Sequence, residues 1–265
     1  MSNEFPFLVS KIAITGEIKT RTGLHIGAGD VGLTVGGADK LVVRSPHNDA
    51  PYIPGSSLKG KMRSILERAG YALEFNVKSA TNDKGEVQWS AEPCKCGKAE
   101  CRVCMVFGVP AEVHATYTAA RTTRLIVRDG HLLNPDEIEN WRYLDMHYTE
   151  LKTEVAIDRL TSQANPRNFE RVPAGARFVL DLVLNIHKDD IEDSYRRLLF
   201  DALELLAFDY LGGQGTRGYG AIEVKVNRID KLDIAKLCGG SPDRWESYAM
   251  QNRITLPWIR PEERS

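Results

Sequence analysis

The segment from Pro54 to Arg63 joins the start of a predicted helix to a cluster of cations. Two serines, the second of them Ser57, stand where a helix cap is expected, and the unpaired backbone N–H groups of a helix start favour an anion. Lys59 and Lys61 add positive charge to the same turns, together with Arg63. This chemistry indicates a phosphodiester backbone as the ligand. An amphipathic surface helix with a solvated charged edge is the alternative interpretation, so other segments must decide between the two.

A second candidate site is a cluster of four cysteines at Cys94, Cys96, Cys101 and Cys104. The spacing of the last two is a common half-site for tetrahedral zinc, although the first pair is tighter than the usual Cys-x-x-Cys. Four close thiolates fill a closed shell and leave no position for catalysis, so the pattern predicts a structural Zn²⁺ ion. A redox pair and four free thiols in a loop are the alternatives. Cys238 stands alone and is interpreted as a small apolar residue.

Composition limits the classes of protein to consider. The chain has 35 basic and 36 acidic residues, so any contact with nucleic acid must come from local patches, which counts against a nonspecific DNA-coating protein. No apolar run approaches the roughly 20 residues that span a bilayer, and Met1 to Val9 lacks the features of a signal peptide. We therefore expect a cytoplasmic protein without a membrane partner, whose cysteines are not paired in disulfides.

The elements that must position these residues follow from hydrophobic periodicity. Period-two alternation predicts strands at 11–18, 122–128, 178–186 and 221–226 and an extended run at 41–43, and helical spacing predicts helices at 57–70 and 189–210. This order predicts an α+β fold with helices on one face of an antiparallel sheet, the ferredoxin-like arrangement that also underlies RNA-recognition modules. The aromatic stacking signature of those modules is absent, so recognition should depend on loops and backbone contacts.

Three further segments depart from this core, which we place at residues 1–230. Residues 78–108 are predicted to be a cysteine-rich insertion that lies outside the main core, and residues 231–265 a C-terminal extension. Residues 145–173 have weak periodicity and a turn near their middle, and are predicted to be a long extended arm. Arg124 and Arg128 alternate with apolar residues and are predicted to form a second cationic patch on one face of the sheet.

Several blocks of residues together resemble the RAMP superfamily, and most closely the Csm-type backbone subunits of type III CRISPR effector complexes. The blocks cover most of the chain, and a glycine-rich loop alone would be weak evidence. They are Thr22 to Gly27, Pro51 to Arg63, Arg124 to Asp129, Ile157 to Thr161, Ala164 to Arg167 and Leu211 to Gly220.

The resemblance implies an RNA-guided complex in antiviral defence. Several copies of the chain would line a guide crRNA alongside other effector-complex subunits, and the arm at 145–173 would act as a thumb that splays out a base at a regular interval. The residues implied at the RNA are His25, Ser57, Lys59, Lys61, Arg63, Arg124 and Arg217, with Gly213 allowing close packing of its loop.

The resemblance also implies cleavage of the paired target RNA, with an aspartate of a glycine-rich loop acting together with a divalent metal. Asp39 is the matching position. A carboxylate can hold Mg²⁺ near a scissile phosphate, where the neighbouring 2′-hydroxyl could attack. Asp30 is a competing candidate, and His25 is a less favoured general base. A non-catalytic RNA-binding scaffold and a metal-independent ribonuclease that processes precursor crRNA are the alternative functions.

Overall fold

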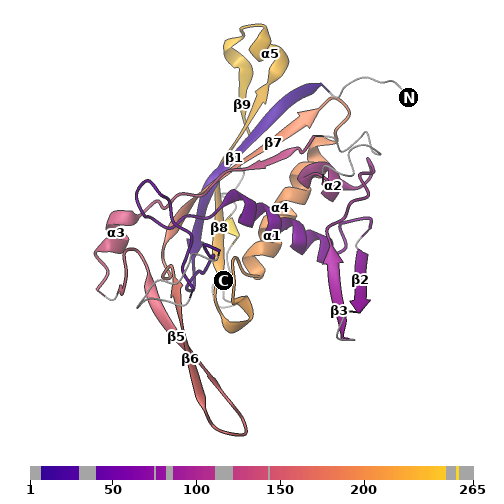
Figure 1. The fold of residues 1–265 in the computed structure, drawn as a ribbon. Helices are drawn as coiled ribbons and strands as arrows, with labels where there is room; N and C mark the ends of the chain where they lie inside the picture. Colours follow the sequence, from indigo (N-terminus) through magenta and orange to yellow (C-terminus); the bar gives the residue numbers. More distant parts are fainter. Residues whose placement is uncertain are drawn as a thin grey trace, which may run out of the picture.

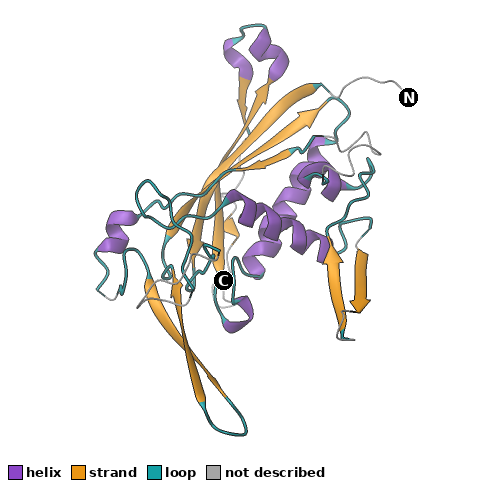
Figure 2. Ribbon diagram, in the orientation of Figure 1, coloured by secondary structure: helices purple, strands orange, loops and turns teal. Residues whose placement is uncertain are grey.

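The structure is a computed structural model that describes residues 7–29, 40–74, 76–81, 86–110, 122–142, 144–248 and 255–256. Figure 1 and Figure 2 show a central sheet with helices packed against it and three projecting segments. The strands are β1 (Leu8–Thr20), β2 (Asn76–Thr81), β3 (Val87–Glu92), β4 (Leu125–Val127), β5 (Glu150–Ile157), β6 (Ala164–Arg171), β7 (Arg177–His187), β8 (Ile222–Asp233), β9 (Trp245–Ser247) and β10 (Thr255–Leu256). The helices are α1 (Gly55–Arg68), α2 (Arg102–Phe107), α3 (Pro135–Glu139), α4 (Glu192–Phe208) and α5 (Ile234–Cys238), with 3-10 turns η2 (Gly215–Arg217) and η3 (Pro242–Arg244).

The central sheet is antiparallel, and its described strands run in the order β10-β8-β1-β7-β4, with β9 also paired to β8. β1 lies between its two longest partners, so that Ile14 stands opposite Leu182 of β7 and Ile229 of β8. The main predicted strands correspond to β1, β7 and β8. The run predicted at 41–43 makes only isolated bridges, and the strand predicted at 122–128 is reduced to β4.

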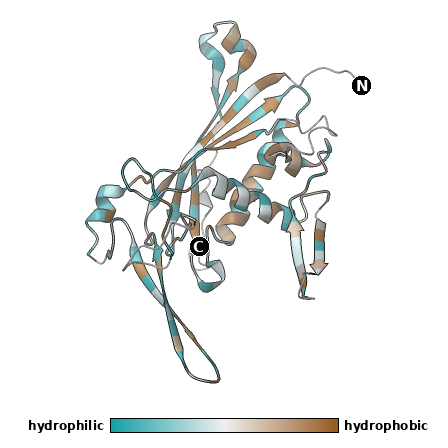
Figure 3. Ribbon diagram, viewed as in Figure 1, coloured by the Kyte–Doolittle hydropathy of each residue, from teal (hydrophilic) through white to brown (hydrophobic). Residues whose placement is uncertain are grey.

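One face of the sheet carries the core. Alternate residues of the long strands point to this face, where α1 and α4 cover them (Figure 1). Figure 3 shows the resulting mixture of hydrophobic and hydrophilic residues along the strands. Burial of each large apolar side chain contributes about 1.5 to 3 kcal/mol. The buried apolar side chains of the central strands are Ile12, Ile14 and Ile18 of β1, Phe178, Leu180, Leu182, Leu184 and Ile186 of β7, and Ile222, Val224 and Val226 of β8.

The two long helices form where helical spacing predicts them. In α1, Leu58, Met62 and the adjacent pair Ile65 and Leu66 form a buried stripe, as predicted. In α4, the helix begins at Glu192 and not at residue 189, because Ile191 has the non-helical backbone of an N-cap residue, and its side chain is 68% exposed. Among the described residues, no helix is long and apolar enough to cross a membrane.

The opposite face of the sheet carries charged residues of both signs, and ion pairs join neighbouring strands there. Lys225 of β8 lies 3.0 Å from Glu17 of β1, and Arg128 lies 2.8 Å from Asp181 of β7. These opposite charges on neighbouring strands stabilise the sheet modestly. Arg128 therefore belongs to a mixed surface of both signs, and not to the cationic patch predicted from its spacing.

Three segments project from the body in Figure 1. The arm predicted from weak periodicity is a hairpin of β5 and β6, and the segment with α5 and β9 extends from the opposite end of the view. β8 continues to Asp233, so the boundary predicted at residue 231 falls inside a strand. β2 and β3 form the third projection.

The cysteine-rich insertion is only partly outside the core. Its hairpin projects, but the four cysteines and most of α2 are buried in the same hydrophobic cluster as α1 and α4. The prediction that the insertion lies outside the main core is therefore wrong for this half of it. The physical reason is that α2 is apolar and packs against α1 and α4, with Val103, Val106 and Phe107 buried.

Candidate nucleic-acid interface

The glycine-rich loop leaves and rejoins the body at two adjacent points. The backbone N–H of Ala28 donates to the oxygen of Leu41 at 3.1 Å, which closes the loop at its base. Asp30 and Asp39 both lie in the segment 30–39, outside the described residues. The structure therefore fixes where the loop starts and ends, and the assignment of the catalytic carboxylate to Asp39 stays a prediction.

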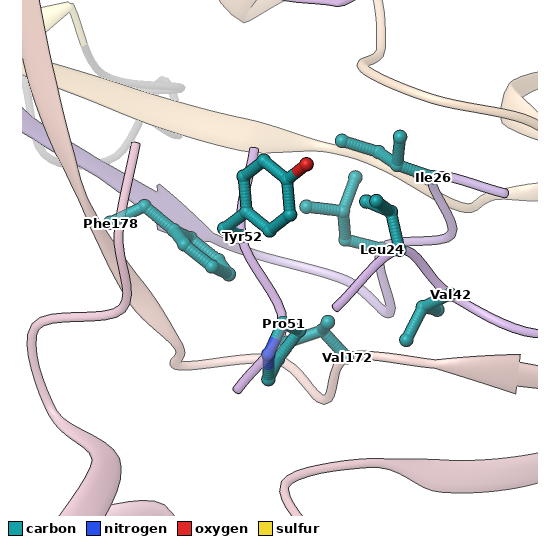
Figure 4. Close-up of a pocket in the computed structure, with 8 residues that line it drawn as sticks. Leu24, Ile26, Val42, Pro51, Tyr52, Val172 and Phe178 are labelled. Atoms are coloured by element: carbon teal, nitrogen blue, oxygen red, sulfur yellow. The ribbon is translucent and has the colours of Figure 1, made fainter. Parts of the chain in front are cut away.

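An apolar cluster anchors both ends of this loop. Figure 4 shows that its side chains converge from the segments before and after the loop and from the strand ends beside them. The void between them has a volume of about 10 Å³, room for a single water molecule at most. Tight packing of this kind makes the base of the loop rigid. The cluster consists of Leu24, Ile26, Val42, Val43, Pro51, Tyr52, Val172 and Phe178.

A buried carboxylate joins the end of the loop to the projecting hairpin. Glu170 of β6 is completely buried, and its side chain accepts hydrogen bonds from Val42 N at 2.8 Å, Thr149 Oγ1 at 2.7 Å and Arg44 Nη2 at 2.5 Å. Its backbone N–H donates to the oxygen of Lys40 at 3.1 Å. A buried charge is tolerated only with such partners. Glu170 therefore ties the hairpin to Lys40 and Val42, the residues that follow the loop.

His25 lies at the other end of the loop and is 6% exposed. Its Nδ1 atom lies 2.7 Å from the backbone oxygen of Glu170, which can only accept, so Nδ1 donates. In the neutral ring, Nε2 is then a hydrogen-bond acceptor. Gly213 N donates to His25 O at 2.8 Å, and Gly212 has a φ of +78° where a Cβ would approach His25 O to 2.3 Å. The structure thus brings His25 and Gly213 together, as close packing of a glycine loop requires.

An open hollow of about 490 Å³ lies beside the middle of the hairpin, where Glu154 pairs with Arg167. Arg217, predicted at the RNA, is on its rim and forms an ion pair with Glu154 of β5 at 3.0 Å. Lys40, the first described residue after the loop, forms a bridge with Phe169 in the wall of the hollow. The hollow therefore lies close to Lys40. Its walls are Glu154, Val155, Ala156, Arg167, Phe169 and Arg217.

The start of α1 differs from the predicted anion site. The helix begins at Gly55, and a carboxylate from the turn after β4 already lies at its N-terminus, with Gly55 N donating to Asp129 Oδ1 at 2.7 Å. A Cβ on Gly55 would come within 2.3 Å of Val127 O, so the helix start is pressed against the sheet. No serine side chain caps the helix, and Ser57 lies inside its first turn. Asp129 thus supplies the negative charge that the sequence pattern assigned to a phosphate.

Substituting Asp129 with alanine is expected to lower the free energy of unfolding by about 1 kcal/mol, the usual cost of a lost helix cap. Urea denaturation followed by circular dichroism measures this change. Asp129→Asn keeps an oxygen that can accept from Gly55 N–H, so it should be the milder variant. Equal stability of Asp129→Ala and wild type would contradict the capping role.

The three cations of α1 that were predicted to contact RNA have different partners within the chain, and Arg63 pairs with Glu67 of the same helix. Lys59 Nζ donates to Leu125 O at 2.9 Å, and burial, followed by the nearby charge of Arg63, lowers the pKa of Lys59. Lys61 lies 3.1 Å from Asp209 and sits over the ring of Tyr210. They therefore do not form one basic surface, and RNA contact by Ser57, Lys59, Lys61 or Arg63 remains a prediction.

Arg124 is buried, contrary to the expectation of an exposed cationic patch. Its Nε and Nη2 atoms each donate to the carboxylate of Asp190 at 3.1 Å, and the two side chains are 3% and 4% exposed. Arg124 is buried because it precedes the short β4 and turns inward to Asp190, which lies just before α4. This bidentate pair satisfies both buried charges.

The four predicted cysteine ligands come together. Their Sγ atoms all lie within 4.8 Å of one another, and all four side chains are buried. The sulfurs of Cys94 and Cys96 lie 3.6 Å apart, and those of Cys96 and Cys104 lie 3.7 Å apart. Zn–S bonds of about 2.3 Å in a tetrahedron separate the sulfurs by about 3.8 Å, so the cluster has the size of a metal site.

The thiols cannot all ionise without a cation. A hydrogen bond from Cys104 lowers the pKa of Cys101 to about 4, while burial raises the pKa of Cys96 to about 11 and the bond to Cys101 raises the pKa of Cys104. One thiolate is thus stabilised at the expense of its neighbours. A bound metal ion removes this conflict, because its charge favours the thiolate at every position.

Sequence reasoning missed the residues that hold the site together. Asp129 was part of a turn signal, and Glu170 and Arg44 were isolated charges in segments without periodicity. Arg167 belongs to the block from Ala164 to Arg167, but no role was predicted for it, although it lines the hollow. Their roles depend on contacts between distant segments, which leave no local pattern.

Comparison with known proteins places this geometry in a family. A model of the RAMP superfamily matches residues 17–223. The chain is 42% identical over 231 residues to a protein named CRISPR system Cms endoribonuclease Csm3 from Methanothermobacter thermautotrophicus, which covers 83% of this chain and 86% of that protein. A protein of the same name from Methanocaldococcus jannaschii is 37% identical over 234 residues, with 87% and 82% covered.

A solved structure agrees with these relatives. It is the crystal structure of a Csm3–Csm4 subcomplex in the type III-A CRISPR-Cas interference complex, with a TM-score of 0.54 and 26% identity, and the match covers 91% of this chain and 89% of that one. The chain therefore belongs to the RAMP superfamily and, within it, to the Csm3 family.

Proposed function

We propose that this chain is a backbone subunit of a type III CRISPR effector complex, which binds guide crRNA and cleaves the paired target RNA. The observation that carries the proposal is the convergence of three features at one place. The ends of the glycine-rich loop, the base of the hairpin and an open hollow with two arginines meet around Glu170 and Phe169. The names of the relatives, which are endoribonucleases, support the same activity.

The hairpin of β5 and β6 acts as the thumb. Apolar side chains along it are exposed without a core to join, with Val155 52%, Ile157 65% and Leu160 96% exposed. Such side chains can wedge between bases, because a base face is apolar and stacks readily. Arg167 in the middle of the hairpin and Arg217 beside it supply the charge for the sugar-phosphate backbone.

His25 contacts RNA through Nε2 in this proposal. As an acceptor in the neutral ring, Nε2 suits a 2′-hydroxyl, which can donate, and not a phosphate, which can only accept. Gly213 supports this position by holding the backbone of His25. Lys59, Lys61 and Arg124 act through their contacts within the protein and shape the surface that the RNA meets.

Asp39 acts at the scissile linkage. Mg²⁺ held by this carboxylate would neutralise charge that develops on the phosphate. The protein's own contribution is to hold the loop against the thumb, so that a splayed nucleotide presents its 2′-hydroxyl in line with the phosphorus. Attack by that hydroxyl leaves a 2′,3′-cyclic phosphate on one product and a 5′-hydroxyl on the other.

The proposal also covers the type of fold, the bound metal, the location in the cell and the other subunits. The strand order β8-β1-β7-β4 with α1 and α4 supports a ferredoxin-like core. The four-cysteine cluster holds structural Zn²⁺, and thiolate ligands of this kind suit the reducing cytoplasm. Further copies of the chain and other effector-complex subunits continue the assembly along the crRNA.

The decisive experiment is to purify the protein from its host and sequence the RNA that remains bound. Short RNAs that share one repeat-derived end are expected. A protein that carries no RNA, and does not bind oligoribonucleotides even at low ionic strength, would contradict the proposal, because backbone contacts are strongest under those conditions.

A further inference from the structure

The segment that carries the four cysteines is held at both ends by one side chain of α1. Arg63 Nη2 donates to the backbone oxygen of Cys94 at 2.7 Å, and Nη1 donates to the backbone oxygen of Gly108 at 3.0 Å. Cys94 is the first cysteine of the cluster, and Gly108 directly follows α2, the helix that carries Cys104. A single guanidinium therefore closes residues 94–108 against α1.

Glu67, one turn later on α1, completes this attachment. Its Oε1 atom accepts from Arg63 Nε at 2.8 Å and from the backbone N–H of Cys94 at 2.9 Å. The Arg63 side chain is 16% exposed and that of Glu67 is 5% exposed. Both polar groups of the Cys94 backbone are thus held by charged side chains, which make stronger hydrogen bonds than neutral ones.

We propose that Arg63 and Glu67 are positioning residues of the metal site, which orient Cys94 toward the ion. The inference rests on the zinc ion of the proposed function. With its N–H and its oxygen both fixed, Cys94 has little freedom to turn its sulfur away. The oxygen that Arg63 binds also borders the cluster, since Cys104 Sγ lies 3.3 Å from it. Loss of such outer contacts typically costs about 10 to 100-fold in metal affinity.

This role differs from the guide-phosphate contact that the sequence predicted for Arg63, and the two roles give different results on substitution. A phosphate contact adds about 1 to the slope of log RNA affinity against log salt. A positioning residue leaves that slope unchanged and alters the rate at which the metal leaves.

The test compares Arg63→Ala with Arg68→Ala in the zinc-loaded, full-length protein. Arg68 lies on the same helix and pairs with Asp209, so its substitution removes the same charge without touching the cysteine segment. Transfer of zinc to a chromogenic chelator is expected to be about 10 to 100-fold faster in Arg63→Ala and unchanged in Arg68→Ala. The difference in Tm between zinc-loaded and chelator-treated protein should shrink only in Arg63→Ala, which a general loss of stability would not cause.

Arg63→Lys keeps the test decisive if the alanine variant does not fold. Lysine can retain some of these hydrogen bonds but not the planar fork, so it should release zinc at an intermediate rate. Zinc release at the wild-type rate in the folded Arg63 variants, or a salt slope lower by about 1, would overturn the role. A wild-type protein that binds no zinc would overturn the metal site as well. Zinc binding without RNA binding would contradict only the proposed RNA function.

Discussion

Complexes assembled with Asp39→Ala protein are expected to retain crRNA and bind target RNA, but to cleave the target at least about 10²-fold more slowly. The reason is that the substitution removes the carboxylate proposed to hold Mg²⁺ while leaving the anchored ends of the loop intact. Cleavage of an end-labelled target under single-turnover conditions measures the rate, and analysis of the product ends checks for the 2′,3′-cyclic phosphate.

Asp30→Ala is the matched control, because it removes the same charge from the same loop. It should cleave close to the wild-type rate. Normal cleavage by Asp39→Ala together with loss in Asp30→Ala would move the catalytic role to Asp30. Absence of metal-dependent cleavage by the wild-type assembly would instead select the scaffold function. Cleavage of precursor RNA in chelator that is abolished by His25→Ala would indicate a processing ribonuclease.

The elements that follow from consecutive residues were predictable. Alternation from Phe178 to Ile186 identifies β7, and the stripe from Leu58 to Leu66 identifies α1, because burial repeats with the period of the element. The cysteine cluster was equally local, since Cys94 to Cys104 folds back within one short segment. These features needed no knowledge of the neighbouring elements.

The partners of the charged side chains were not predictable in this way. Lys59 and Arg124 both belong to basic patterns, but one donates to a backbone oxygen of the sheet and the other is buried against Asp190. The sequence shows a charge and its neighbours, whereas the fold decides whether an opposite charge from a distant segment meets it. A prediction that rests on basic residues beside a helix start therefore overestimates the exposed cationic surface.

Glu170 is a residue of the candidate site whose partners also could not be predicted from the sequence. It stands in a charged arm with no motif, yet it is completely buried and joins the hairpin to the segment that follows the loop. Its importance arises because the glycine-rich loop and the arm are far apart in the sequence but share one anchoring point. The segment that follows the glycine-rich loop is thus held by residues that a search for catalytic patterns does not find.

Replacement of Cys101 by serine is expected to lower the free energy of unfolding by about 4 kcal/mol and Tm by about 8 to 16 °C. A serine hydroxyl is a poor ligand for zinc, and the cluster is buried against α1 and α4, so loss of the ion loosens the core and not only a surface loop. Thermal unfolding of the zinc-loaded proteins, with metal content determined on the same samples, measures the effect.

Cys238→Ser is the matched control, because Cys238 is exposed and lies outside the cluster. It should melt with the wild type. A strong chelator should lower the Tm of wild-type protein toward that of Cys101→Ser and lower the variant further only slightly, because both treatments remove the same ion. If Cys101→Ser keeps the wild-type Tm, or if chelation lowers both proteins equally, the metal does not stabilise the fold through Cys101. The apolar residues of α2 would then hold the segment in the core by packing alone.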